Sequence, residues 1–294
     1  MISSSATVRA GFEDFQLDSA LERGIAGAGF SQPRPIQTQT IPAALEGRDI
    51  LGLAQTGTGK TAAFALPLLQ RMLSRRRAGT RALILAPTRE LASQIDAEIR
   101  LLARHTGVKT LTIFGGVPMG AQIRGLRRSP EIVVACPGRL LDLHGQGRLD
   151  LSTVEALVLD EADHMFDMGF LPSIRQILAL LPAQRQNLLF SATMPREIRR
   201  LADEILHRPH VVELSHSKPA ETIEHSLYPV LADRKRDLLD HLLREDSCHT
   251  AIVFTRTKHR ARRLAQQLSR SGHNAVALQG NMTQGQRDRA MKGF

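Results

Sequence analysis

The chain has 294 residues, of which 42% are hydrophobic and 23% are charged, and its formal net charge is +10 at pH 7. This balance is typical of a soluble globular protein and excludes a fibrous or fully disordered one. No run approaches the ~20 consecutive apolar residues of a membrane-spanning helix, so we expect no such span. The length suits two domains, or one domain and part of another.

Residues 1–10 lack the basic head and apolar run of an export signal, and we expect a disordered lead-in to a cytoplasmic protein. The two cysteines, Cys136 and Cys248, are too few for a disulfide framework or a thiolate metal site. Excess positive charge favours a polyanionic partner, because clustered cations displace counterions from phosphates. Only six of the 39 basic residues are lysine, however, and codon bias can produce such a skew. Charge alone therefore leaves nucleic acid and an ordinary solvated surface equally open.

Short apolar runs alternate with helical patterns along the first two thirds of the chain. We expect strands at residues 49–53, 82–86, 111–114, 132–135, 156–159 and 188–190. Between them, apolar residues recur at three- and four-residue spacing over 61–76 and 89–104, which predicts helices. This alternation predicts an α/β fold in which helices cover both faces of a parallel sheet. Ligands of such sheets bind beyond the carboxyl ends of the strands.

A polar, proline-bearing stretch at 215–222 is typical of a linker. It separates a first domain over 11–214 from a second part over 223–294. In that second part we expect an apolar run at 223–230, helices at 234–244 and 259–271, and strands at 251–255 and 275–278. These are too few strands to complete a doubly wound sheet, so we expect an incomplete second α/β domain.

A glycine-rich segment at residues 54–61, AQTGTGKT, follows the first predicted strand and opens a helix. Its glycines let successive backbone N–H groups point at phosphate oxygens, beside the positive end of the helix dipole. Lys60 would contact the β- and γ-phosphates, and the Thr61 hydroxyl would be one Mg²⁺ ligand. The motif usually opens with glycine, where this chain has Ala54. The nucleotide-binding residues expected of the loop are Thr56, Gly57, Thr58, Gly59, Lys60 and Thr61.

An acidic segment, DEAD, occupies residues 160–163 directly after the predicted strand at 156–159. Mg²⁺ is a hard cation that keeps several waters and takes one or two carboxylates. We expect Asp160 to be that ligand, through water, and Glu161 to orient or deprotonate the attacking water, with Lys60 completing the catalytic set. An isolated acidic tetrad would be a solvated turn, an alternative that the phosphate loop upstream disfavours.

Together with Ser191-Ala-Thr193, these two motifs resemble the DEAD-box family of ATP-dependent RNA helicases over essentially the whole chain. The resemblance implies RecA-like domains, ATP and Mg²⁺ as cofactors, and RNA as the partner. Residues 29–37 resemble the family's Q motif, in which Gln37 would read the adenine edge and Phe30 would pack on the ring. A glutamine amide can accept a hydrogen bond from adenine N6 and donate one to N7. Guanine does not offer this pair of donor and acceptor. Arg34 stands where threonine is usual.

Other segments resemble the family's RNA-backbone contacts, which suit phosphates rather than base edges. Alone, each would be an ordinary turn, whereas three at one sheet edge favour function. The implied RNA-contacting residues are Pro87, Thr88, Arg89, Gly115, Gly116, Pro137, Gly138 and Arg139 in the first domain, and Arg256, Gly280, Gln284 and Arg287 in the second. Ser191 and Thr193, with Asp163 as their partner, would couple hydrolysis to strand separation, since hydroxyls exchange partners cheaply.

In the family, the second domain continues with a motif V that contacts ATP and RNA and a His- and Arg-rich motif VI, whose arginines are worth roughly 10³–10⁵ in turnover. Neither precedes Phe294, so we expect a C-terminally truncated chain of low activity, or else a naturally short product. The leading interpretation is a monomeric bacterial RNA helicase of the RhlE-like subgroup, with ribosome-assembly or RNA-decay proteins as candidate partners. The alternatives are a hydrolysis-deficient ATP- and RNA-binding fragment and a DNA translocase.

Overall fold

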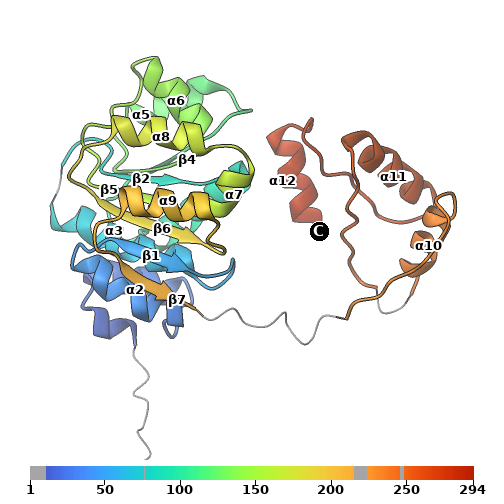
Figure 1. The fold of residues 1–294 in the computed structure, drawn as a ribbon, viewed down its shortest axis with the longest axis horizontal. Helices are drawn as coiled ribbons and strands as arrows, with labels where there is room; N and C mark the ends of the chain where they lie inside the picture. The colour runs from blue at the N-terminus through green and yellow to red at the C-terminus, as the bar shows by residue number, and fades with distance from the viewer. Residues whose placement is uncertain (1–10, 76, 215–223, 246–247) are drawn as a thin grey trace, which may run out of the picture. The chain divides into compact units, whose positions relative to one another are not determined.

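The computed structural model describes residues 11–75, 77–214, 224–245 and 248–294 (Figure 1). The expected lead-in at 1–10 and linker at 215–222 lie outside the described residues. The chain divides into two compact units, Met1–Ser217 and Lys218–Phe294. Among the described helices, none has both the length and the apolar character that crossing a bilayer requires.

Unit 1 is built on a seven-stranded sheet with the strand order β3-β4-β2-β5-β6-β1-β7. All neighbouring strands run parallel. The strands are β1 (Ile50–Leu53), β2 (Ala82–Leu85), β3 (Thr110–Ile113), β4 (Ile132–Ala135), β5 (Ala156–Leu159), β6 (Gln186–Ser191) and β7 (His210–Glu213). The six strands expected from the sequence are confirmed. The seventh, β7, pairs with β1 at the edge of the sheet and buries only Val212, which explains its weaker apolar signal.

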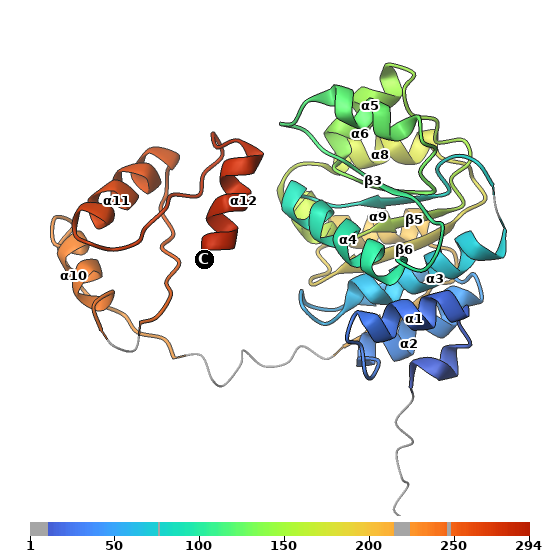
Figure 2. The ribbon, with the colours of Figure 1, turned by 180° about the vertical axis from the view of Figure 1, so that it is seen from behind.

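Helices cover both faces of the sheet, as predicted (Figures 1 and 2). One face carries the short helix η1 (Phe12–Phe15) with α1 (Ser19–Gly27), α2 (Pro35–Leu45), α3 (Lys60–Ser74) and α4 (Arg89–Leu102). The other carries α5 (Met119–Leu126), α6 (Pro137–Gly145), α7 (Ala162–Asp167), α8 (Leu171–Leu180) and α9 (Arg196–Ile205). Successive residues of β2 alternate between the two cores, Ile84 in one and Leu83 in the other. Burial on both faces explains why the central strands are continuous apolar runs.

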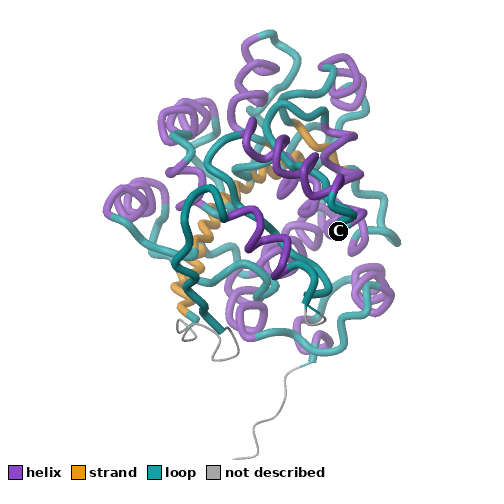
Figure 3. Tube along the Cα trace, turned by 90° about the vertical axis from the view of Figure 1, so that its right-hand side faces the viewer, coloured by secondary structure: helices purple, strands orange, loops and turns teal. Residues whose placement is uncertain are grey.

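Unit 2 contains α10 (Lys235–Leu242), α11 (Lys258–Arg270) and α12 (Gln284–Gly293), and the two helices expected at 234–244 and 259–271 are confirmed. The strands expected at 251–255 and 275–278 are wrong, because the described strands all belong to unit 1 (Figure 3). A strand needs a neighbour to satisfy its backbone N–H and C=O groups, and these segments pair with no described strand. Their apolar side chains are accordingly exposed, with Phe254 at 93%.

Candidate active site

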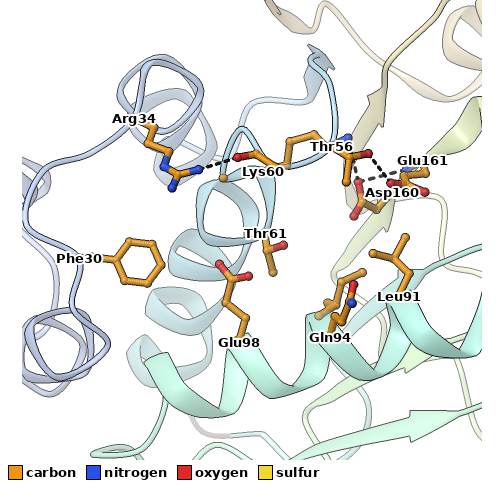
Figure 4. A pocket seen from close by; sticks show the side chains of 13 residues that line it. Phe30, Arg34, Thr56, Lys60, Thr61, Leu91, Gln94, Glu98, Asp160 and Glu161 are labelled. Atoms are coloured by element: carbon orange, nitrogen blue, oxygen red, sulfur yellow. Dashed lines mark hydrogen bonds and ion pairs between the residues drawn. The ribbon is translucent and has the colours of Figure 1, made fainter. Parts of the chain in front are cut away.

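A pocket of about 430 Å³ lies at the start of α3, with α4 as one wall (Figure 4). Its phosphate loop follows β1, and Asp160 and Glu161 follow β5, so both motifs come from carboxyl ends of strands, where parallel sheets bind ligands. The residues that line it are Phe30, Arg34, Thr56, Gly57, Gly59, Lys60, Thr61, Leu91, Gln94, Ile95, Glu98, Asp160 and Glu161. The two predicted motifs, about one hundred residues apart, therefore meet in one cavity.

The phosphate loop needs glycine at two positions. Gly57 and Gly59 have φ values of 85° and 94°, in the left-handed region that side chains rarely adopt. A Cβ atom at Gly59 would also lie 2.7 Å from Nε2 of Gln37. At the start of the loop the side chain of Ala54 is buried in the core, and its backbone N–H donates to the carbonyl of Ser191 at 3.0 Å. The methyl group that replaces the usual glycine hydrogen is therefore accommodated by packing.

Lys60 and Asp160 form a buried charge pair in the lining of the pocket. Lys60 Nζ lies 3.8 Å from Asp160 Oδ1 and donates to the carbonyl of Ala54 at 3.1 Å. Their side chains are only 6% and 3% exposed. Burial raises the pKa of Asp160 to about 6, against the opposing effect of the Lys60 charge. The ammonium thus neutralises the carboxylate expected to bind Mg²⁺, and both lie where a polyphosphate would reach them.

Glu161 lies one residue beyond Asp160 in a strained conformation, with a φ of 54° at the N-terminal end of α7. A left-handed non-glycine residue costs on the order of 1–3 kcal/mol, so its surroundings must hold it there. Thr56 Oγ1 donates to Glu161 Oε1 at 2.8 Å, and His164 Nδ1 lies 3.3 Å from Oε2. Neither contact was foreseen from the sequence. They place the predicted catalytic carboxylate against the phosphate loop.

The adenine end of the predicted site is only partly formed. Phe30 lines the pocket and meets Phe12 edge to face, with ring centroids 6.0 Å apart. Gln37, in contrast, is fully buried and is absent from the lining. Its Oε1 accepts the backbone N–H of Arg34 at 2.8 Å, and its Nε2 donates to the carbonyl of Gly59 at 3.1 Å. One of these bonds must open or be shared before Gln37 can read an adenine, and that role stays a prediction.

The predicted coupling residues are in direct contact. Asp163 Oδ2 accepts hydrogen bonds from the backbone N–H of Thr193 at 2.9 Å and from its hydroxyl at 2.8 Å. The Asp163 backbone N–H donates to Ser191 Oγ at 3.2 Å. Burial raises the pKa of the Asp163 carboxyl, but hydrogen bonds from Thr193 and Ser191 more than offset this and hold it below its ordinary value. The expected partnership of Asp163 is confirmed.

The first-domain segments expected to contact RNA follow β2, β3 and β4, which are adjacent in the sheet. They therefore share one edge, as predicted. Thr88 caps α4, and the side chain of Arg89 fills the space beside Gly116, where a Cβ would clash with it. Arg139 donates to the carbonyl of Val117 at 3.2 Å, while its buried Nε has no hydrogen-bond partner in the described structure. Of the remaining members of the set, Pro87 and Gly115 lie in the loops after β2 and β3, and Pro137 and Gly138 begin α6.

The second-domain candidates lie in unit 2. Arg256 precedes α11, Gly280 precedes α12, and Gln284 and Arg287 belong to α12. The contribution of these residues to RNA binding stays a prediction.

Two charged pocket residues were missed by sequence reasoning as site residues: Arg34, noted only as a departure from threonine, and Glu98. A signal for the second existed. Leu91, Gln94 and Glu98 follow the three-, four- and seven-residue spacing that places side chains on one helix face, and that face borders α3.

A phosphate loop after one parallel strand and an acidic turn after another define unit 1 as a RecA-like domain. The model of the DEAD/DEAH box helicase family matches residues 34–201, and that of the helicase conserved C-terminal domain matches residues 234–294. The chain belongs to the DEAD/DEAH box helicase family.

Relatives come from several bacteria. The chain is 43% identical to the ATP-dependent RNA helicase CshA of Listeria monocytogenes, over 96% of this chain and 54% of that protein. It is 42% identical to the ATP-dependent RNA helicase DeaD of Escherichia coli, over 96% of this chain and 45% of that protein. A crystal structure of a DEAD box protein from Methanococcus jannaschii is similar with a TM-score of 0.66 and 36% identity, over 96% of this chain and 76% of that one. The chain thus spans about half the length of the curated relatives it matches.

Proposed function

We propose that this chain is the ATP-binding and RNA-binding part of an ATP-dependent RNA helicase, which couples ATP hydrolysis to local remodelling of RNA duplexes. The observation that carries the proposal is the meeting of Lys60, Asp160 and Glu161 in one pocket at the phosphate loop. Asp163 lies in α7, two residues after Glu161, and accepts a hydrogen bond from the Thr193 hydroxyl beyond the end of β6. A nucleotide in the pocket would contact Lys60, Asp160 and Glu161 directly. Through α7 it would also act on Asp163 and Thr193.

The residues of the pocket suit the phosphates, the metal ion and the base of ATP. The backbone N–H groups of the loop and Lys60 would hold the β- and γ-phosphates, and Phe30 would pack on the base. Asp160 and Thr61 both line the cavity with oxygen atoms, the donors that Mg²⁺ prefers, so these residues fit that ion. Bound there, Mg²⁺ would neutralise charge on the phosphates. Gln37 would complete adenine recognition once it releases the carbonyl of Gly59.

Glu161 would act on the water that attacks the γ-phosphorus. The water oxygen forms a bond to phosphorus as the bond to the β-phosphate oxygen breaks, and Glu161 accepts the proton that the water loses. In the described structure the Thr56 hydroxyl already donates to one of the Glu161 oxygens. The other oxygen lies 3.3 Å from His164 Nδ1, so nucleotide binding would have to release one of these two contacts before the water can reach the carboxylate.

RNA would lie along the edge formed by the carboxyl ends of β2, β3 and β4. The turns there present backbone N–H groups together with Arg89 and Arg139, which suits phosphates and gives little sequence specificity. We infer further that the protein acts in the bacterial cytoplasm as a monomer of the RhlE-like subgroup, with ribosome-assembly or RNA-decay proteins as partners. The bacterial relatives support a bacterial helicase, and the motif pattern alone is the ground for the subgroup, the oligomeric state and the partners.

One observation favours a second function, an ATP- and RNA-binding fragment that hydrolyses ATP poorly. Unit 2 exposes large apolar side chains, with Leu227 at 92% and Phe254 at 93%, and its described residues form no sheet. A unit without a sheet would not hold its side chains in fixed positions to assist hydrolysis. Hydrolysis would then depend on unit 1 alone.

A turnover experiment separates the two functions. ATP binding by residues 1–294 is measured by calorimetry, and phosphate release is measured with and without single-stranded RNA. Binding together with RNA-stimulated release supports the helicase motor, while binding without stimulated release supports the binding fragment. Failure to bind ATP would overturn the proposal as a whole. A Lys60→Ala variant, which should bind no ATP, controls for contaminating ATPases.

A further inference from the structure

Two opposite charges line the pocket without a role assigned above: Glu98 lies outside every predicted motif, and Arg34 lies within the Q motif where threonine is usual. Glu98 projects from α4, and Arg34 immediately precedes α2 (Figure 4). Both line the cavity beside Thr61, and Glu98 is half-buried. A carboxylate inside a pocket built for a polyphosphate would repel its ligand, so its position calls for an explanation.

The carboxylate of Glu98 lies beside Thr61 in the first turn of α3, where a phosphate would bind (Figure 4). Burial raises the pKa of Glu98, whereas the Thr61 hydroxyl, the charge of Arg34 and the backbone N–H of Ala62 act in the opposite direction and favour the carboxylate. The first N–H groups of a helix have no partner within the helix and bind anions, with the helix dipole adding to the attraction. Glu98 therefore satisfies, from a neighbouring helix, part of the anion site at the start of α3.

Arg34 lies on the other side of this carboxylate. Its Nη1 donates to the carbonyl of Gly57 at 2.6 Å, and its charge acts on Glu98. A guanidinium carries five N–H groups, so the bond to Gly57 leaves donors that can receive a carboxylate, and paired N–H groups do so bidentately. A carboxylate leaving α3 would thus find a cation within the same pocket.

We propose that Glu98 is an internal anion that occupies the start of α3 when no nucleotide is bound, and that nucleotide phosphate displaces it onto Arg34. Glu98 is then a residue that weakens nucleotide binding, and Arg34 is a positioning residue that limits this weakening. The inference rests on the proposed binding of ATP to this pocket.

The energetics give each side chain a distinct effect. Removing the charge of Glu98 removes both the competition for Thr61 and Ala62 and the repulsion of the phosphates, so affinity rises. Removing Arg34 leaves the displaced carboxylate without a partner, so affinity falls. Because the role of Arg34 passes through Glu98, its loss has no effect once Glu98 is already uncharged. Two residues that act as one unit are expected to be non-additive in this way.

The test is a double-mutant cycle on the full chain. Calorimetry gives Kd values for ATP, ADP and adenosine with the unaltered chain, Glu98→Gln, Arg34→Thr and the double variant. Threonine is the residue that the Q motif usually has at this position. Glu22→Gln, which removes an exposed carboxylate on α1, is the matched control for loss of a charge. Expected couplings of this kind are on the order of fivefold or more.

We expect Glu98→Gln to tighten ATP and ADP about fivefold or more, Arg34→Thr to weaken both by a similar factor, and the double variant to match Glu98→Gln. Adenosine affinity should not change, because adenosine carries no phosphate. Unchanged or weaker ATP binding by Glu98→Gln overturns the proposal while leaving the ATP site intact. Additive effects in the double variant overturn the role of Arg34 and assign it to direct phosphate contact. Failure of the unaltered chain to bind ATP overturns both this inference and the proposed function.

Discussion

The Thr56 hydroxyl donates a 2.8 Å hydrogen bond to Glu161, joining the phosphate loop to the acidic turn that follows β5. Thr56 and Glu161 are separated by more than one hundred residues of sequence, and the bond holds the carboxylate although its backbone is strained. In this arrangement the carboxylate is positioned but not yet available to a water molecule on both oxygens. Substitution of Glu161 is therefore expected to affect ATP hydrolysis without a matching effect on ATP binding.

Glu161→Gln should retain ATP binding and lose turnover. The amide keeps the size of the side chain and can still accept from Thr56, but it cannot take a proton from water. General-base catalysis is worth roughly 10²–10⁴, so we expect RNA-stimulated phosphate release to fall by about that factor, with an ATP Kd within about threefold of the unaltered chain. Turnover equal to that of the unaltered chain would remove Glu161 from the chemical step. Glu46→Gln, an exposed carboxylate after α2, serves as the control.

Lys60→Met should abolish ATP binding and also destabilise unit 1. The substitution leaves Asp160 buried without its cation, and breaking one side of a buried charge pair costs roughly 3–5 kcal/mol. The double variant Lys60→Met, Asp160→Asn should recover most of the lost stability but none of the binding. Urea unfolding and calorimetry measure the two effects separately. A single variant as stable as the unaltered chain would show that the pair is not coupled.

The pKa of Asp160 predicts a pH dependence with a definite sign. Burial raises this pKa to about 6 in the folded chain, above the ordinary aspartate value of about 3.9. The folded state thus holds a proton that the unfolded state has lost, so this group makes the free energy of unfolding fall as pH rises from about 4 to about 6. Urea titrations at several pH values should show this slope as the difference between the unaltered chain and Asp160→Asn. A constant difference between the two proteins across that range would contradict the prediction.

Arg81 should matter for stability and not for nucleotide binding. It is 1% exposed and lies at the amino end of β2, away from the pocket at the carboxyl ends. Its Nε and Nη2 donate to Glu155 at 3.2 and 3.0 Å, and Nη1 donates to the carbonyl of Met72 at 3.3 Å. Arg81→Met removes these bonds and leaves Glu155 with the longer contact to Arg77 at 3.5 Å, and we expect a loss of about 2–4 kcal/mol in urea unfolding. ATP affinity below the unfolding transition should not change, and a large change would place Arg81 in the site.

Backbone amides of residues 251–255 should exchange with solvent hydrogen far faster than those of β1. The latter are hydrogen-bonded between two neighbouring strands, whereas the former belong to no described strand. Exchange followed by mass spectrometry on peptides from both segments measures the difference. Equal protection would mean that residues 251–255 form a stable strand in solution.

Strands that are buried on both faces of the sheet could be predicted from the sequence more reliably than the other segments. Strands such as β2 and β5 are apolar at every position because they lie in the middle of the sheet, so both their type and their limits could be predicted. Residues 251–255 are also an apolar run. An apolar run forms a strand only where another strand pairs with it, and composition does not show whether such a strand is present. The apolar pattern therefore predicts which segments could be strands, but strand pairing depends on the tertiary structure.

The candidate site divides in the same way. Lys60, Asp160 and Glu161 were predictable because their chemistry depends on fixed spacing from strand ends. The burial of Gln37 was not, since its amide bonds to Arg34 and Gly59, and only the folded chain brings α2 against the phosphate loop. Glu98 lies in an ordinary amphipathic helix, and its role depends on which face borders α3.

The hydrogen bond from the Ala54 backbone to the carbonyl of Ser191 extends the pairing of β1 and β6 by one step, into the phosphate loop itself. The Ser191 hydroxyl in turn accepts a hydrogen bond from the backbone N–H of Asp163. The carboxylate of Asp163 accepts a hydrogen bond from the hydroxyl of Thr193. The first residue of the loop and the coupling segment are therefore consecutive links of one chain of hydrogen bonds. A displacement of the loop would reach Thr193 through the Ala54 backbone N–H, then through the Ser191 hydroxyl and the Asp163 carboxylate. Only the first of these links is backbone to backbone, so it is the one that side-chain substitutions in the loop leave intact.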